Sequence, residues 1–167
     1  MIYKVSDINL IKDILVKEKK TLAVGESVTS GHLQAAFSQA ANASDFFQGG
    51  ITVYNAGQKC RHLHIEPIQA LKNNCVSEDI ACTMARESSK MFLSDYGIGI
   101  TGYAAKVPEQ GITKLFSYCA INLGDKIILS KKILPSRDLK EGLKIQLDYT
   151  AQVIALFLKI LKSKKRS

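Results

Sequence analysis

Apolar side chains recur every three or four positions in four stretches of the chain, a spacing typical of amphipathic helices. We expect these helices over residues 7–19, 33–40, 77–91 and 138–162. Ser6 and Ser77 stand at the start of the first and third, where a hydroxyl can accept a hydrogen bond from a free backbone N–H. Each apolar stripe needs a surface to cover it, so the helices are expected to pack against a sheet.

Shorter apolar runs between these helices predict strands. We place them at residues 21–24, 50–54, 98–100, 115–121 and 126–133. Gly25 ends the first strand in this interpretation, and residues 122–125 join the last two as a hairpin. Strands that alternate with helices favour an α/β fold, a three-layer α/β/α sandwich with a mostly parallel mixed sheet and an antiparallel edge. The chain shows no linker or repeat, which predicts a single domain over residues 1–167.

The composition is that of a packed globular protein, with 46% hydrophobic and 23% charged residues. No apolar run is long enough to cross a membrane, and the first residues lack the pattern of a secretory signal, so we expect a cytoplasmic protein. The net charge of +8 is concentrated at residues 17–20 and in the tail from Lys159 to Arg166. Because no aromatic-studded basic strand accompanies these clusters, the sequence argues against nucleic-acid binding.

The cysteines and histidines do not suggest a metal site. The four cysteines form no CxxC pair, and a cytoplasmic chain of this size builds a core without disulfides, so we expect free thiols. His62 and His64 form an HxH pair without an evident third ligand. A metal site needs more convergent ligands than two, which favours a solvated or helix-capping role for this pair.

Three polar clusters follow predicted strands, at residues 26–31, 54–59 and 101–105. In an open α/β sheet, ligands bind beyond the carboxyl ends of the strands, where such loops gather. Each cluster alone also has an ordinary structural explanation. A Ser or Thr at a strand–helix junction is most often an N-cap, a Lys after a strand is usually a solvated charge, and Thr-Gly is usually a turn.

Taken together, the clusters resemble the ordered signatures of the CinA C-terminal domain family. Residues 25–31 (Gly-Glu-Ser-Val-Thr-Ser-Gly) resemble its A-E-S-x-T-G-G segment, and Tyr54 with Lys59 resembles T-Y-x-N-E-x-K. Residues 76–78 match V-S-E, and residues 101–104 stand where the family has S-G-x-A. The likeness runs from about residue 15 to residue 157.

This resemblance implies an amidohydrolase, because members of the family hydrolyse the carboxamide of nicotinamide mononucleotide to nicotinic acid mononucleotide and ammonia. Ser27 would be the nucleophile and neutral Lys59 the general base, with Tyr54 orienting them. The N-terminus of the following helix would supply backbone N–H donors to the oxyanion. We expect Lys59 within hydrogen-bond reach of Ser27, about 2.6 to 3.5 Å.

The same resemblance implies a nucleotide-binding shell around this pair. Its residues are Glu26, Thr29, Ser30, Gly31, Thr101, Gly102 and Arg137. No metal or organic cofactor is required. The implied protein is the short, stand-alone form of the family and a homo-oligomer, a dimer, whose partner is a small-molecule nucleotide substrate.

Several positions depart from the family pattern. Ser30 replaces the first glycine of the G-G pair, residues 56–57 replace an asparagine and a glutamate, and the glycine-rich loop is shortened to residues 107–111. Arg137 is the one arginine retained from a late G-D-R segment of the family pattern, and Lys106 has no counterpart in that pattern. Both are candidate phosphate ligands. Two classes of function therefore stay open. One is an active amidohydrolase, and the other is a divergent paralogue that binds a nucleotide-like ligand or a protein partner without turnover.

Overall fold

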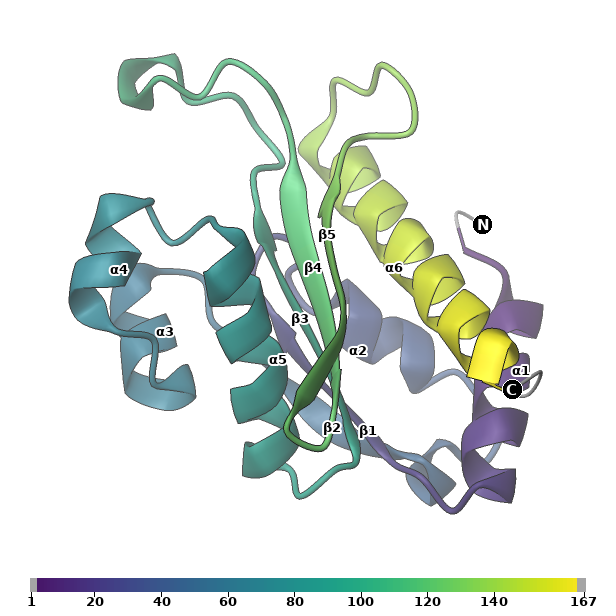
Figure 1. Cartoon of the computed structure of the whole chain (residues 1–167). Coiled ribbons are helices and arrows are strands. Elements are labelled where there is room, and N and C mark those ends of the chain that lie inside the picture. Colours follow the sequence, from purple (N-terminus) through teal and green to yellow (C-terminus); the bar gives the residue numbers. More distant parts are fainter. Residues whose placement is uncertain (1–2, 165–167) are drawn as a thin grey trace.

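A computed structural model describes residues 3–164 as three layers with a five-stranded sheet in the middle (Figure 1). The strands are β1 (Leu22–Glu26), β2 (Phe47–Thr52), β3 (Tyr96–Gly102), β4 (Ser117–Leu123) and β5 (Lys126–Ile133). The helices are α1 (Val5–Lys17), α2 (His32–Phe37), α3 (Ala56–Leu63), α4 (Pro67–Lys72), α5 (Glu78–Met91) and α6 (Gly142–Lys164), with 3-10 turns η1 (Ala43–Asp45) and η2 (Pro108–Gln110). The predicted three-layer α/β fold is confirmed, and the end of the basic tail, Lys165 and Arg166, lies outside the described residues.

The strand order is β2-β1-β3-β4-β5. β2, β1 and β3 are mutually parallel, whereas β4 runs antiparallel to β3 and β5 antiparallel to β4, so the sheet is mixed as expected. It follows that β1, β2, β3 and β5 all end at the same edge of the sheet. The loops that follow these strands start from this edge, and those after β3 and β5 extend above the sheet at the top of Figure 1.

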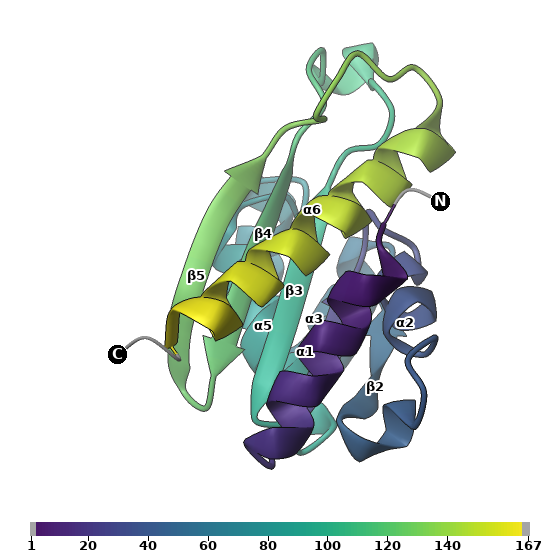
Figure 2. The same cartoon turned by 90° about the vertical axis from the view of Figure 1, so that its right-hand side faces the viewer.

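The two faces of the sheet are covered by different helices. α5 packs on β1, β3 and β4 with α3 and α4 beside it, and α1, α2 and α6 cover the other face (Figures 1 and 2). The larger core lies under α1, α2 and α6, where the fully buried large side chains include Phe37, Phe157 and Tyr149. Helices therefore cover both faces of the sheet, so we expect the functional groups at the edge where the loops gather.

Some predicted boundaries were wrong for identifiable reasons. Ser6 lies inside α1, which begins at Val5 after Lys4 and has no side-chain cap. Gly25 lies within β1 rather than ending it, because it pairs with both β2 and β3 in the middle of the sheet. The last helix starts at Gly142 rather than near residue 138, since residues 134–141 form a loop beside it.

Other predicted features, the second strand, the Ser77 cap and the hairpin, were confirmed fully or in part. β2 starts at Phe47, three residues before the predicted strand, because Gly49 and Gly50 interrupt its apolar pattern. The Ser77 cap is confirmed, since the hydroxyl accepts a hydrogen bond from the N–H of Ile80 at 3.2 Å. The hairpin is also confirmed, although Asn122 is a buried strand residue and not part of the turn. Across residues 3–164, none of the helices combines the length and hydrophobicity that a membrane crossing requires.

Candidate functional site

A cavity of about 570 Å³ lies at the edge where β1, β2 and β3 end, and we refer to it as the amide cavity. Four of the predicted site residues line it: Ser27, Tyr54, Lys59 and Gly102. They come from three segments of the chain, at or after the ends of β1, β2 and β3, and the parallel strands bring these segments together. The remaining walls include residues 74–76, residues 103–105 and the start of α6 with Gln146.

Ser27 is the first residue after β1 and is fixed by its backbone. Its N–H donates to the carbonyl of Ile100 on β3 at 3.1 Å, so the strand pairing continues into the loop. The side chain is nearly buried, with 5% of the residue exposed, yet it lines the cavity. A hydroxyl in this position is both accessible to a bound ligand and held by the sheet.

Glu26 and Thr29 support this loop from beneath and do not line the cavity. The buried Glu26 carboxylate accepts hydrogen bonds from the Thr29 hydroxyl at 2.6 Å and from the N–H groups of Leu33 at 3.0 Å and Gln34 at 2.9 Å. A fourth bond comes from the N–H of Gly31 at 3.2 Å. The carboxylate thus satisfies the free N–H groups at the start of α2, where an N-cap side chain would otherwise act.

This arrangement changes the expected source of the oxyanion donors. The first N–H groups of α2 are directed to Glu26, and the N–H of Ser30 donates to the Ser27 carbonyl at 3.1 Å. In the part of the chain that the structure describes, the N–H groups of Val28 and Thr29 donate to no backbone or side-chain acceptor. Of the two residues, Val28 directly follows Ser27 and lines the amide cavity, so its N–H is the available donor for an anionic oxygen there.

Lys59 enters the cavity from the first turns of α3. Asn55 caps this helix by accepting from the N–H of Gln58 at 3.0 Å, and helical side chains lean toward the N-terminus, which directs Lys59 back to the cavity. Lys59 is 3% exposed. This burial lowers the pKa of its amine below the ordinary 10.5, because an ammonium loses its hydration there.

Two neighbouring thiols, Cys75 and Cys60, oppose this shift in the pKa of Lys59 when they are ionised. Burial raises the pKa of the Cys75 thiol, which keeps it neutral near pH 7 and leaves the lowered pKa of Lys59 as the dominant effect. Lys59 and Ser27 share the cavity wall without a direct hydrogen bond between them in residues 3–164. The expected Ser27–Lys59 hydrogen bond is thus not formed in the described residues.

The remaining predicted residues fall into different positions. Tyr54 lines the amide cavity and is 71% exposed, so its ring lies at the mouth. Thr101 is fully buried and donates to the carbonyl of Cys75 at 2.7 Å, which ties the end of β3 to residues 74–76. Gly102 lines the cavity directly.

Ser30 and Gly31 form the turn into α2, and both have positive φ angles, of 49° and 92°. This left-handed conformation favours glycine, so Ser30 occupies a position where a side chain adds strain. Its hydroxyl accepts from Gln146 of α6 at 3.3 Å. Neither residue lines the amide cavity, but both set the course of the loop that carries Ser27.

Arg137 and Lys106 line a second cavity of about 860 Å³, which also contains Ala104 and Ala105 from the wall of the amide cavity. The two cavities are therefore neighbours along the same edge. The sequence prediction placed Arg137 with the substrate shell of Ser27, and the structure places it one cavity away.

Sequence reasoning missed Asn74, Tyr103 and Gln146, which line the amide cavity. The side-chain amide of Asn74 donates to the Tyr103 hydroxyl at 3.2 Å and to Gln110 at 2.8 Å. These bonds join the turn before α5 to the long loop after β3. The only sequence signal was that Asn74 immediately precedes the Cys-Val-Ser-Glu start of α5.

His62 and His64 do not converge. His62 bonds to Gln58 at 3.0 Å within α3, whereas His64 bonds to Glu87 of α5 at 2.7 Å. Among residues 3–164, no three His, Cys, Asp or Glu side chains gather as a metal ion would require. The four cysteines are free thiols, and burial raises the pKa of Cys119 to about 12.

Fold and site together define an α/β domain with a serine and a buried, low-pKa lysine on one cavity wall. The sequence matches the family model described as the CinA C-terminal domain over residues 6–132. The chain therefore belongs to the CinA C-terminal domain family.

Relatives of known sequence agree with this membership. The chain is 40% identical over 110 residues to a CinA-like protein of Picosynechococcus sp., covering 66% of this chain and 26% of that protein. It is 33% identical over 146 residues to a protein of Natranaerobius thermophilus described as competence-damage inducible, covering 84% of this chain and 35% of that protein. The chain thus spans between a quarter and about a third of the length of these relatives.

Solved structures show the same fold. A CinA superfamily protein from Enterobacter cloacae superposes with a TM-score of 0.87 at 24% identity, covering 95% of this chain and 93% of that one. A competence or damage-inducible protein from Enterobacter asburiae gives 0.86 at 22% identity, covering 94% and 97%. At such identities the likeness establishes the architecture alone.

Proposed function

We propose that this chain hydrolyses the carboxamide of nicotinamide mononucleotide to nicotinic acid mononucleotide and ammonia. The observation that carries the proposal is the placement of Ser27 and of Lys59, whose pKa burial lowers, on one cavity wall at the carboxyl edge of the parallel strands. A serine hydroxyl needs a base to become nucleophilic, and a lysine can serve only when it is neutral. Burial of Lys59 supports that neutral state.

In the first half of the reaction, Ser27 Oγ attacks the carboxamide carbon while its proton passes to Lys59 Nζ. The negative oxygen of the tetrahedral intermediate accepts a hydrogen bond from the N–H of Val28, which lines the cavity. The C–N bond then breaks, and Lys59 returns the proton to the departing nitrogen, which leaves as ammonia. Ser27 is left as an acyl ester.

In the second half, water attacks the ester with Lys59 again accepting a proton, and Ser27 Oγ departs with that proton. The product carries a carboxylate where the amide was. In this proposal the hydrogen bond between Ser27 and Lys59 forms when the bound substrate excludes water from the cavity. We assign Tyr54, at the mouth of the cavity, a contact with the pyridine ring or the ribose.

The test is ammonia release from nicotinamide mononucleotide by the wild-type chain and by Ser27→Ala. We expect kcat to fall at least about a thousandfold when the nucleophile is lost. Ser38→Ala removes a hydroxyl that bonds only to the carbonyl of Ala35 at the end of α2, and it should leave the rate unchanged. Full activity in Ser27→Ala would contradict the mechanism.

A second function is ligand binding without turnover. The strained Ser30 turn and the absent Ser27–Lys59 bond favour it, since both differ from what an assembled Ser/Lys pair requires. Calorimetric titration with nicotinamide mononucleotide separates the two functions. Saturable binding by the wild-type chain without ammonia release would support the binding function and overturn the amidase.

A further inference from the structure

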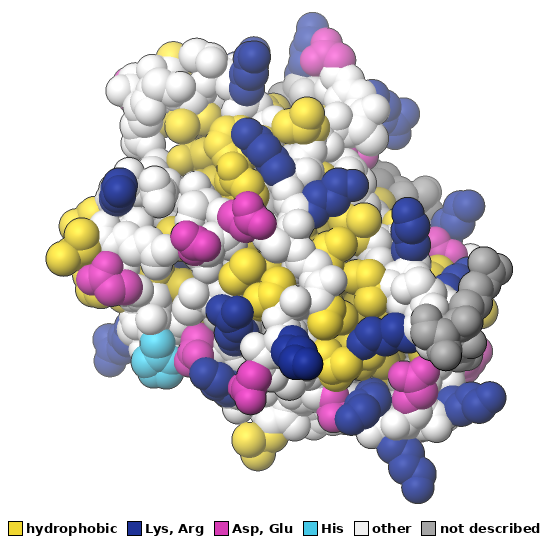
Figure 3. All heavy atoms as spheres, in the orientation of Figure 1, with side chains coloured by type: hydrophobic (Ala, Val, Ile, Leu, Met, Phe, Trp, Pro, Cys, Tyr) yellow, Lys and Arg dark blue, Asp and Glu magenta, His cyan; other side chains and the backbone are white. Residues whose placement is uncertain are grey.

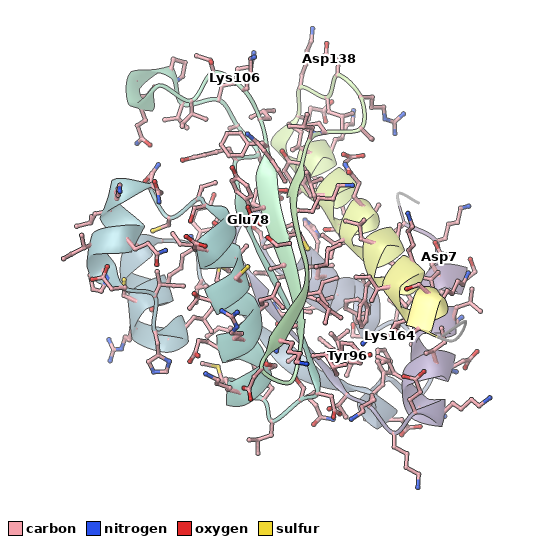
Figure 4. The ribbon with its side chains drawn as sticks, in the orientation of Figure 1. Asp7, Glu78, Tyr96, Lys106, Asp138 and Lys164 are labelled. Carbon is pink, nitrogen blue, oxygen red and sulfur yellow. The ribbon has the colours of Figure 1, made fainter. Side chains whose placement is uncertain are left out.

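The second cavity is larger than the amide cavity and has a different character. We refer to it as the cationic cavity, and it lies between the loop after β3 and the loop that joins β5 to α6. Figure 4 shows Lys106 and Asp138 on these two loops above the sheet. Because Ala104 and Ala105 line both cavities, a ligand can extend from one into the other.

The rim of this cavity is strongly positive. Four cations line it, Lys106, Lys114, Arg137 and Lys140, against one carboxylate, Asp138. All five side chains are exposed, and the ion pairs within residues 3–164 include none of them. Four cations from two loops around one hollow attract an anion of more than one charge.

The interior of the cationic cavity is apolar. Leu115, Leu134, Pro135 and Leu139 contribute to its lining, and Leu134 is 60% exposed. In Figure 3, dark blue cations surround yellow apolar surface in the upper part of this face. A ligand that fits must therefore combine negative charge with a flat or apolar group that covers the leucines.

Both walls are held by α6, so the cavity is largely formed before a ligand arrives. Asp148 accepts hydrogen bonds from the N–H and the hydroxyl of Ser136, and Gln152 donates to the carbonyl of Leu134 at 2.8 Å. On the side of the loop after β3, the Tyr149 hydroxyl donates to the carbonyl of Tyr103, the residue before Ala104, at 3.2 Å. A preformed site loses less conformational entropy when it binds.

We infer that the cationic cavity binds the nucleoside diphosphate half of a dinucleotide whose amide-bearing half occupies the amide cavity. This inference rests on the proposed amidase function and names a substrate class for it. A cavity of about 570 Å³ is within the range that encloses a small ligand, so a mononucleotide does not need the second cavity. The two phosphates interact with the four cations, and the base packs against the leucines.

The first measurement is calorimetric titration of the wild-type chain with adenosine diphosphate, with inorganic pyrophosphate and adenosine as separate probes. We expect adenosine diphosphate to bind more tightly than either part alone, and added salt to weaken it. Lys114→Glu combined with Lys140→Glu should lower its affinity about tenfold or more, since each reversal replaces attraction by repulsion. Lys126→Glu combined with Lys131→Glu on β5 makes the same charge change outside both cavities and should have little effect.

The second measurement is ammonia release from nicotinamide adenine dinucleotide and from nicotinamide mononucleotide. The Lys114/Lys140 variant should raise KM for the dinucleotide about tenfold and leave KM for the mononucleotide within about twofold. An equal rise for both substrates would overturn the inference, because the cavity would then hold the phosphate of the mononucleotide itself. Equal binding of pyrophosphate and adenosine diphosphate would overturn the role of the leucines.

The two proposals can fail separately. Hydrolysis of the mononucleotide with no binding of adenosine diphosphate overturns the dinucleotide inference and leaves the amidase intact. Binding of adenosine diphosphate that the Lys114/Lys140 variant abolishes, with neither amide hydrolysed, supports the nucleoside diphosphate site and overturns the amidase.

Discussion

Two loops that follow neighbouring parallel strands differ in how they are held. Residues 27–31, after β1, form a short loop, and the buried Glu26 carboxylate holds it through Thr29 and Gly31 and holds the start of α2 through Leu33 and Gln34. Residues 103–116, after β3, are long and mostly exposed, and they are tied down by Asn74 and by the Tyr149–Tyr103 bond. The Ser27 hydroxyl, the proposed nucleophile, thus lies on a rigid segment, whereas the proposed substrate would be enclosed by a loop, a kind of segment that can vary in length and sequence.

Lys59→Met gives the largest expected effect, because it removes the proposed general base for Ser27 on the rigid loop. We expect kcat to fall at least about a thousandfold in the ammonia-release assay. In the wild type, kcat/KM should rise with pH through the pKa of Lys59, which lies below 10.5, since the neutral amine is the active form. A pH profile that falls over this range would contradict Lys59 as the base.

The same substitution should stabilise the fold. The pKa of Lys59 is lower in the folded state than in the unfolded chain, so protonation of Lys59 opposes folding, fully so below the folded pKa and not at all above the unfolded one. Methionine removes this cost at pH 7 and fills a similar volume. We expect the midpoint of thermal unfolding to rise by about 2 to 4 °C, whereas Lys72→Met at the exposed end of α4 should not change it.

Glu26→Ala should destabilise the protein by about 3 kcal/mol, as measured by urea unfolding. The substitution leaves three backbone N–H groups and the Thr29 hydroxyl without an acceptor in a buried position. Glu66→Ala is the matched control, because Glu66 caps α4 in the same way, through two N–H groups, but at the surface. It should cost about 1 kcal/mol. Equal losses in the two variants would show that the Ser27 loop is no more rigid than a surface turn.

Glu26 and Ser27 are adjacent, yet the sequence predicted the position of Ser27 and not the role of Glu26. The order of strands and polar clusters was sufficient to bring Ser27, Tyr54 and Lys59 to one edge, because parallel strands end on the same side of a sheet. The role of Glu26 could not be predicted, since its partners Leu33 and Gln34 become neighbours only when α2 turns back toward β1. An acidic residue beside a serine in a signature motif looks the same in sequence whether it binds a ligand or caps a helix.

The cationic cavity was predicted only in part, through Arg137 and Lys106 as candidate phosphate ligands. Its four cations come from two segments, residues 106–114 and 137–140, which meet because β3 and β5 end at the same edge with β4 between them. Lys114 precedes β4 and Lys140 lies in a loop that the sequence pattern assigned to a helix. These two lysines come close because of the strand order, and the strand order cannot be predicted from the hydrophobic periodicity of each segment.

Asn74→Gly gives the smallest expected effect and tests the second loop. Asn74 has a φ of 47°, which glycine adopts without strain, so the substitution removes the bonds to Tyr103 and Gln110 while preserving the turn. We expect KM for the mononucleotide to rise about two- to fivefold with kcat nearly unchanged, because the loop must then be ordered at the expense of binding free energy. Asn73→Ala, next in the chain but outside the amide cavity, should change neither constant. If Asn74→Gly lowers kcat as strongly as it raises KM, the long loop positions the reacting groups as well, and the division between a rigid catalytic loop and an adaptable enclosing loop is wrong.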